Sequence, residues 1–411
     1  MRRTLILFIA LLLLLSSAAV FAAGEAQVYT WQEIASEAAR QQPNLLSAQE
    51  KVKQAGYSEN ILRSGQLPQV SLGGSLDDGA NYSLGVSARQ LLFDGFKTSL
   101  DIQKAENDTI ASGYNAALAS AQVRLRLRKA FIDLLKNQEL LKMSEIIAGR
   151  REQNLKLVEL LYEAGKEHYG AYLTAKAKLF QAQSDLKQLK RTLQYSQKAL
   201  SLELNKKDNM SLVVTGDLQV IVNYSPDLEF LASEHPSIKN LELQQESAAL
   251  SLRAAQSDNW PSLTAGASGQ FGGSHDRNSA TNWSASLSLS LTLWDAGKRS
   301  GNVDKAISVI EQLGYDAESS RRQLALDLAS AWNNLQNSLD QIEVQKQYLQ
   351  ASEVRAKIAD SQYTNGLVSF DDWTIIEDGL IDSQKALLNS QSSALLAEAN
   401  FIQVQGGALE K

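Results

Sequence analysis

The amino-acid sequence predicts a mainly α-helical protein that also carries membrane β-strands. Two proline-free runs, about 95–163 and about 296–364, have the apolar period of a helix. Before each run, apolar and small polar residues alternate as they do in a β-strand. The same order of segments occurs twice, so the chain is internally duplicated.

Composition excludes several classes of protein. The 411 residues include no cysteine, which rules out disulfides, thiolate nucleophiles, cysteine metal sites and a lipidated cysteine. The formal net charge of −6 argues against a nucleic-acid partner, because such proteins usually carry a basic excess. We therefore expect neither cysteine chemistry nor a nucleic-acid-binding surface.

The first residues have the pattern of a secretory signal peptide, which we place at 1–22. Arg2 and Arg3 precede an apolar core from Leu5 to Leu15, and Val20-Phe21-Ala22 resembles a cleavage site. The alternative is an N-terminal membrane anchor, for which the apolar run is short. No later stretch is apolar enough for a membrane helix, so we expect an exported protein that spans a membrane only by strands.

Two series of matched residues define the repeats, 23–223 and 224–411. Pro43 and Pro68 match Pro236 and Pro261 at an offset of 193 residues. After the strands the offset becomes 201, so the second strand loop is eight residues longer. The matches at this second offset include Phe93-Asp94 with Trp294-Asp295, Lys97 with Lys298, Tyr114 with Tyr315, Phe131 with Trp332, Tyr162 with Tyr363 and Gly165 with Gly366.

Each repeat is expected to contain short helices, a strand hairpin, a long helix, a turn and a return helix. A helix of this length extends roughly 100 Å, so it must belong to a coiled coil or a tube. Apolar residues at 328, 332, 335, 339 and 342 follow heptad spacing, and the first repeat has the same pattern with a polar break at Gln138. The expected ranges are 70–93, 95–163 and 171–204 in the first repeat, and 262–294, 296–364 and 371–404 in the second.

The long helices are expected to end at Gly165 and Gly366, in the sequences YEAG and YTNG. Glycine commonly takes the left-handed conformation that terminates a helix. Residues 205–235 look like a linker, which together with the C-terminal tail would form a small belt around the helices.

The strands alternate so regularly that each has one apolar and one polar face. From Trp283 to Leu293 every second residue is apolar, and serine or threonine fills the other positions. A soluble half-buried sheet would alternate too, but Trp283 and Trp294 bracket the apolar band as membrane-interface aromatics would. Four strands cannot close a barrel, so chains must combine: two would give 8 strands and three would give 12.

This combination of motifs resembles the outer membrane efflux protein family, the TolC-like channels. The resemblance covers the mature chain and lies in LPQVSL and WPSLTA, in the junctions LLFDGFK and LTLWDAGK, and in the turns around Gly165 and Gly366. It implies a homotrimer with a 12-stranded β-barrel continuous with a long α-helical coiled-coil barrel. It also implies outer membrane lipid, a periplasmic adaptor protein and an inner-membrane pump of RND, ABC or MFS type as partners, with the two turns as adaptor contacts.

The resemblance also points to a pore constriction after the second turn. Asp372 matches a family position whose acid points into the tunnel, Asp371 is its neighbour, and Tyr363 matches a residue that holds the tip closed through polar links. Those links are in question because Val368 and Ala171 occupy the matching basic and acidic positions, so gating would depend more on packing. The alternative for the two aspartates is N-terminal capping of the return helix.

No catalytic, cofactor or metal site is expected. His168, His235 and His275 have no ligand spacing and are expected on the surface, and no phosphate-binding glycine loop is present. The sequence thus predicts a passive exit duct of a tripartite efflux or type I secretion system in the bacterial outer membrane. A periplasmic coiled-coil scaffold without channel activity is the alternative, and an enzyme or lectin on a helical stalk is a second one.

Overall fold

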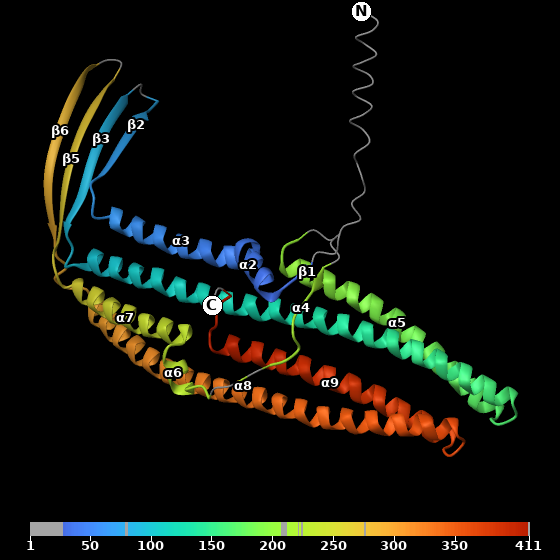
Figure 1. The fold of residues 1–411 in the computed structure, drawn as a ribbon. Coiled ribbons are helices and arrows are strands. Elements are labelled where there is room, and N and C mark those ends of the chain that lie inside the picture. Colours follow the sequence, from blue (N-terminus) through green and yellow to red (C-terminus); the bar gives the residue numbers. More distant parts are fainter. Residues whose placement is uncertain are drawn as a thin grey trace, which may run out of the picture. The chain divides into compact units, whose positions relative to one another are not determined.

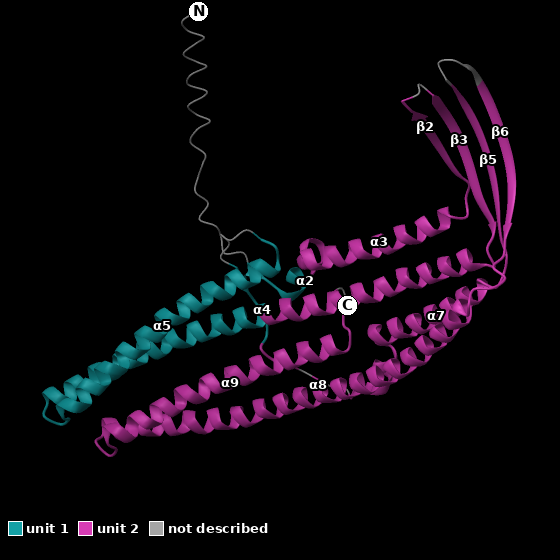
Figure 2. Cartoon of the chain, turned by 180° about the vertical axis from the view of Figure 1, so that it is seen from behind, with its two compact units in different colours: residues 1–34, 130–217 teal, residues 35–129, 218–411 magenta. Residues whose placement is uncertain are grey.

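The computed structural model describes residues 28–78, 81–206, 212–220, 222, 225–274 and 277–409, with side chains of 274–279 left out. The expected signal peptide and His275 lie outside the described residues. The chain divides into two compact units (Figure 2). Unit 1 comprises 1–34 and 130–217, and unit 2 comprises 35–129 and 218–411.

A four-stranded antiparallel sheet lies in unit 2, in the order β2-β3-β5-β6 (Figure 1). Its two hairpins come from the two repeats, and β3 pairs with β5 to join them. Within the described chain, β2 and β6 have no further strand beside them. The strands are β2 (Gln69–Leu76), β3 (Tyr82–Phe93), β5 (Ser262–Ser274) and β6 (Arg277–Ser290).

The strand β6 is shorter than its alternation predicts. Apolar and polar residues alternate as far as Leu293, but the last residue of β6 is Ser290, which pairs with Ser262. Pro261 precedes Ser262 and has no N–H to donate to a ladder, so pairing has no reason to continue. The end of β6 is therefore set by the proline that precedes the paired strand β5, and not by the residue pattern of β6 itself.

Two left-handed residues connect each hairpin to its long helix. In the first repeat they are Gly95 (φ 71°) and Phe96 (φ 70°), and in the second Ala296 (φ 56°) and Gly297 (φ 87°). Glycine thus occupies the first left-handed position in one repeat and the second in the other. Each junction also holds one residue for which this conformation is unfavourable, because a side chain adds steric strain at positive φ.

Two helices of 67 residues follow these junctions: α4 (Lys97–Glu163), which runs through both units, and α8 (Lys298–Thr364). The return helices are α5 (Tyr169–Glu203) and α9 (Phe370–Val404). The expected heptad seam of α8 is confirmed: Leu328 and Leu335 are buried with Phe401 of α9, and Trp332 packs on the Phe401 ring at 5.2 Å.

A contact within unit 1 gives the structural reason for the polar residue Gln138 in the heptad seam of α4. Gln138 of α4 donates through Nε2 to the carbonyl oxygen of Val214 at 2.8 Å, and its Oε1 accepts from the Val214 N–H at 2.9 Å. Val214 belongs to β4 (Val213–Val214), which pairs in parallel with β1 (Val28–Tyr29). The side-chain amide of Gln138 therefore holds the extended segment at Val214 in place. A leucine at position 138 could not bond the backbone N–H and carbonyl groups of Val214.

Short helices lead into each half of the sheet. They are α2 (Trp31–Gln41) and α3 (Pro43–Ser64) in the first repeat, and α6 (Leu228–Ser233) and α7 (Pro236–Ser257) in the second. Gln42 caps α3, and the matching His235 caps α7. The expectation that His235 lies on the surface is wrong, since it is 6 % exposed. It lies against Pro236 and beside Gly406 of the C-terminal tail, where a longer residue than glycine would clash.

Candidate functional site

The turn between α8 and α9, which we call the second tip, is built on a left-handed glycine. Gly366 has φ 72°, its N–H donates to the Tyr363 carbonyl at 2.9 Å, and the Leu367 N–H donates to the Gln362 carbonyl at 2.9 Å. These two bonds are those of the Schellman motif, which satisfies carbonyls at a helix end. The expected left-handed cap at Gly366 is confirmed.

Three aromatic side chains hold the second tip together. Tyr363 stacks on Trp373 with ring centroids 4.3 Å apart and an interplanar angle of 8°, and Phe370 lies 6.2 Å from both rings. The indole Nε1 of Trp373 donates to Oδ1 of Asp360 at 3.2 Å. Tyr363 is only 4 % exposed and Trp373 is 2 % exposed, so the turn is fixed by a packed aromatic cluster.

Both acidic candidates are exposed in the first turn of α9. The Ser369 hydroxyl accepts from the Asp372 N–H at 3.1 Å and donates to Oδ2 of Asp372 at 2.7 Å. Asp372 therefore takes part in the N-terminal cap, and both carboxylates lie where the positive end of the helix dipole favours negative charge. Capping leaves the remaining carboxylate oxygens free to face water.

The turn between α4 and α5, the first tip, has the same backbone but a different cluster. Gly165 has φ 70°, and the Gly165 and Lys166 N–H groups donate to Tyr162 and Leu161, so the left-handed cap expected here is confirmed too. The rings of Tyr162, Tyr169 and Tyr172 lie 5.6–6.0 Å apart. Tyr169 is 55 % exposed, so this cluster presents its rings to solvent.

Trp373 is the tip residue that sequence reasoning missed. It follows Phe370 by three positions and precedes Glu377 by four, which places all three on one face of α9, and all three are buried. That spacing is the signal that would have identified the buried face. The partner Asp360 lies on α8, however, and local spacing gives no sign of a bond between two helices.

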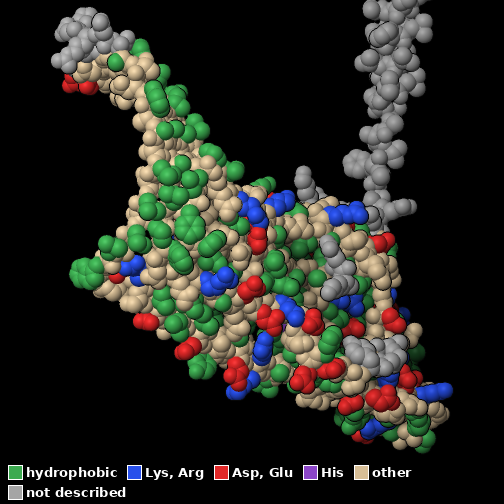
Figure 3. All heavy atoms as spheres, turned by 90° about the vertical axis from the view of Figure 1, so that its left-hand side faces the viewer, with side chains coloured by type: hydrophobic (Ala, Val, Ile, Leu, Met, Phe, Trp, Pro, Cys, Tyr) green, Lys and Arg blue, Asp and Glu red, His purple; other side chains and the backbone are tan. Residues whose placement is uncertain are grey.

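The sheet carries one continuous apolar face. Across the four strands the register aligns Leu72 with Val86, Val86 with Gly269, and Gly269 with Trp283. Hydrophobic side chains lie along the strands among uncharged ones, whereas most lysine, arginine, aspartate and glutamate side chains in this view lie over the helices (Figure 3). Trp283 is 84 % exposed within β6, and Trp294 is equally exposed beyond its end. A largely exposed apolar face that extends over four strands indicates a binding or membrane surface.

The other face of the sheet consists mostly of hydroxyl groups and glycine. Ser71, Ser87, Ser268 and Ser284 lie side by side across all four strands. The hydroxyl of Ser71 bonds that of Ser87 at 2.8 Å, and the hydroxyl of Ser268 bonds that of Ser284 at 2.9 Å. This face is suited to contact with water.

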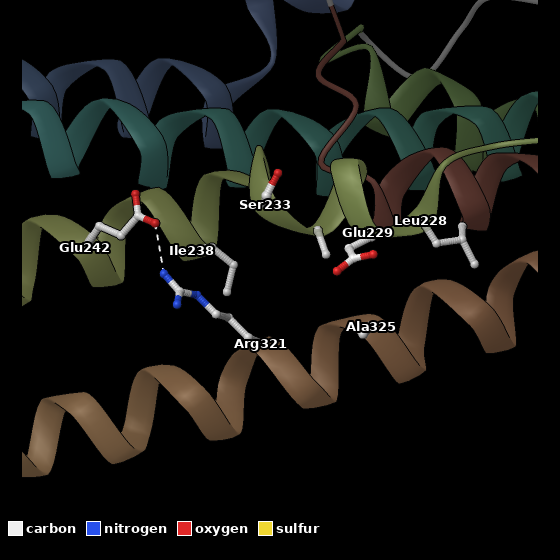
Figure 4. A pocket seen from close by; sticks show the side chains of 8 residues that line it. Leu228, Glu229, Ser233, Ile238, Glu242, Arg321 and Ala325 are labelled. Carbon is white, nitrogen blue, oxygen red and sulfur yellow. Dashed lines mark hydrogen bonds and ion pairs between the residues drawn. The ribbon is translucent and has the colours of Figure 1, made fainter.

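A pocket of about 590 Å³ lies between α6, α7 and α8 (Figure 4). Leu228, Ala232 and Ile238 contribute apolar side chains to it, and Arg321 of α8 reaches across to Oε1 of Glu242 of α7 at 3.0 Å. Both partners of this ion pair are largely exposed, so the pair adds little stability.

Neither a metal site nor a membrane helix is found in the part of the chain that the structure describes. No three histidine, aspartate or glutamate side chains there lie close enough together to hold an ion. None of the described helices combines the length and apolar content that crossing a membrane requires.

Comparison with known proteins identifies a family. A family model described as outer membrane efflux protein matches residues 34–206 and again residues 229–407, which supports the internal duplication. No curated protein matches the sequence.

Several solved structures share the fold at low sequence identity. VceC from Vibrio cholerae is 18 % identical with a TM-score of 0.77, over 92 % of this chain and 96 % of that one. The MtrE outer membrane channel of Neisseria gonorrhoeae, in its open state, is 19 % identical with a TM-score of 0.80, over 92 % and 89 %. The CmeC outer membrane channel of Campylobacter jejuni is 15 % identical with a TM-score of 0.77, over 92 % and 86 %.

Proposed function

Because the chain belongs to the outer membrane efflux protein family, we propose that it is the outer membrane exit duct of an efflux or type I secretion system. Three copies form a 12-stranded β-barrel that continues into a coiled-coil barrel of helices. The duct conducts solutes passively, since the sequence offers no nucleotide-binding motif through which it would couple energy. The driving force comes from an inner-membrane pump of RND, ABC or MFS type, which a periplasmic adaptor links to the duct.

The four-stranded sheet carries this proposal. One face is apolar and exposed, the other is lined by serine and glycine, and β2 and β6 form its edges in the described chain. In lipid, an open edge would leave backbone N–H and C=O groups without partners at a cost of several kcal/mol each. The edges must therefore pair with other copies. Twelve strands leave a water-filled lumen, whereas eight are nearly filled by their own side chains.

The aromatic residues at the sheet fit this orientation. Trp283 and Trp294 lie at different heights along β6 and its extension, and both are exposed. Indole rings prefer the boundary between lipid and water. We assign them to the interface of outer membrane lipid.

The two tips are the proposed adaptor contacts. At each tip an exposed left-handed glycine, Gly165 or Gly366, brings the turn to a compact end. Leu367 is exposed at the second tip and Tyr169 at the first, so each offers an apolar side chain to a partner. Apolar anchors surrounded by polar residues are typical of protein interfaces.

Asp371 and Asp372 are the proposed constriction. In a trimer the exposed carboxylates of three copies would form a ring, which attracts cations and disfavours close approach of the tips through like-charge repulsion. Tyr363 contributes by packing, because it stacks on Trp373 within its own tip. Capping by Ser369 and the pore role are compatible, since capping uses one carboxylate oxygen of Asp372.

Planar-bilayer recording of the purified protein tests the proposal. A detergent-extracted sample should be a stable trimer and should conduct ions. Asp372→Ala should lower cation selectivity at low salt, while Asp340→Ala, which removes an exposed acid from the middle of α8, serves as the control. A monomer that needs no detergent and shows no conductance would refute the duct and favour the periplasmic scaffold. Unchanged selectivity in Asp372→Ala would remove only the ring.

A further inference from the structure

A single charged residue interrupts the hydroxyl-lined face of the sheet. Among strand residues whose side chains the structure describes, Arg89 of β3 is the only one with a charge. It shares its face with Ser83, Gly85 and Ser87, which lie at alternating positions on the same strand. Arg89 therefore belongs to the wall that faces water and not to the apolar face.

The neighbours of Arg89 leave its charge uncompensated. The register places it between Gln69 of β2 and Gly266 of β5, and Gly266 pairs with Ser286 of β6. None of these residues is acidic, and no carboxylate of the described chain lies within ion-pair distance of its guanidinium. Arg89 is exposed, so the charge is available to solutes.

The position of Arg89 along the sheet is also defined. Gln69 is the first residue of β2 and follows the end of α3 at Ser64 by five residues. Arg89 lies five residues before Asp94, which is in the short connection between β3 and α4. The row of serines through Ser87 is the next on the same face, about 7 Å further from the helices. Arg89 thus marks the end of the sheet nearest the long helices.

We infer that Arg89 makes the barrel lumen selective for anions over cations. This inference rests on the proposed trimeric barrel, in which three copies of Arg89 form a ring at the helix end of the lumen. The exported solutes that pass this ring most readily are anionic, and cationic ones meet an electrostatic barrier there. The ring has the opposite sign to the carboxylates proposed at the second tip.

The expected size of the effect follows from the barrel dimensions. Twelve strands about 4.8 Å apart and tilted by about 40° close with a backbone radius of roughly 12 Å. The Debye length is about 10 Å at 0.1 M salt, about 30 Å at 0.01 M and about 3 Å at 1 M. Three unit charges at that radius would change the anion-to-cation permeability ratio by about threefold at 0.1 M, about tenfold at 0.01 M and immeasurably at 1 M.

Reversal potentials across salt gradients in planar bilayers measure this ratio. Arg89→Gln should lower it by about threefold near 0.1 M and by about tenfold near 0.01 M. Adding Ser87→Arg to that variant moves the charge by one row on the same face and should raise the anion-to-cation permeability ratio back toward the wild-type value. This relocation separates the effect of the lumen charge from any structural role of the original side chain.

The possible results distinguish failure of the Arg89 inference from failure of the proposed duct. A ratio that is unchanged in Arg89→Gln at 0.01 M overturns the inference, while the conductance itself still supports the duct. Absence of both trimer and conductance in the wild-type protein defeats the proposed function instead. If Arg89→Gln does not assemble, Ser87→Glu in the otherwise native chain decides the matter: it places three negative charges beside the ring and should lower the ratio by a similar factor.

Discussion

The two tips have the same backbone conformation, but their aromatic side chains pack differently. Both use a left-handed glycine and the same pair of N–H bonds to the preceding helix end. In the second tip Tyr363 is stacked and buried, whereas in the first tip the matching Tyr162 belongs to an exposed cluster. The two repeats thus share the turn but differ in how firmly side chains hold it.

The largest expected effect lies in the aromatic cluster of the second tip. Trp373→Ala should lower the free energy of local unfolding there by about 3–5 kcal/mol, because a fully buried ring and its bond to Asp360 are lost. The matched change Tyr172→Ala at the first tip should cost about 1 kcal/mol, since that ring is half-buried. Hydrogen exchange of the turn and adjacent helix ends measures both. Equal losses of protection would show that the aromatic clusters of the two tips stabilise their turns equally.

The glycines provide the next test, in which the tips should respond alike. Gly165→Ala and Gly366→Ala should each cost about 1–2 kcal/mol, because alanine at positive φ is strained. An added Cβ meets no atom within 4 Å at either position, so only the backbone conformation contributes. Hydrogen exchange at the turn amides is the readout. Costs that differ by more than a factor of two would mean that the shared turn is not equivalent in solution.

The N-terminal caps of the return helices should have smaller effects. Ser369→Ala at the second tip and His168→Ala at the first each remove a side chain that accepts a backbone N–H, from Asp372 and from Ala171 respectively. Each should cost about 1 kcal/mol of local stability. The replacements Ser369→Asn and His168→Asn should keep most of it, because asparagine caps helices well. Fraying that persists in the asparagine variants would contradict a capping role.

The smallest expected effect is a pH dependence of the N-terminal cap of α7. His235 caps α7, and the matching residue Gln42 caps α3 in the first repeat. Nδ1 of His235 accepts from the Ser237 N–H at 3.2 Å and must be unprotonated to do so. Burial lowers the pKa of His235 below its ordinary value of 6.5. As the pH falls below about 6.5, the unfolded chain binds a proton that the folded chain does not, so stability decreases as pH decreases through that window.

Protection of α7 against hydrogen exchange should therefore fall as the pH is lowered from about 7 toward 5, after correction for intrinsic exchange. Protection of α3 is the internal control, because Gln42 does not titrate while its Oε1 accepts from Asn44 and Leu45. His235→Gln should make α7 behave like α3. If α7 keeps its pH dependence in that variant, another group is responsible.

The local order of residues is enough to predict several parts of the fold. Alternation over a few residues defines strands with two faces, the absence of proline permits helices of 67 residues, and glycine after Tyr-x-x marks the turns. The heptad spacing also identified the seam that packs on Phe401. The duplication was visible because matched residues recur at constant offsets.

How these elements pack and which of their side chains are buried depends on contacts that local order does not reveal. Tyr162 and Tyr363 have the same spacing to glycine, yet only the second is buried, because Trp373 and Asp360 meet across two helices. Gln138 interrupts the seam because it bonds a strand 76 residues away, and His235 is buried because the C-terminal tail lies beside it. Each outcome depends on contacts between residues far apart in the chain, and local periodicity carries no information about such contacts.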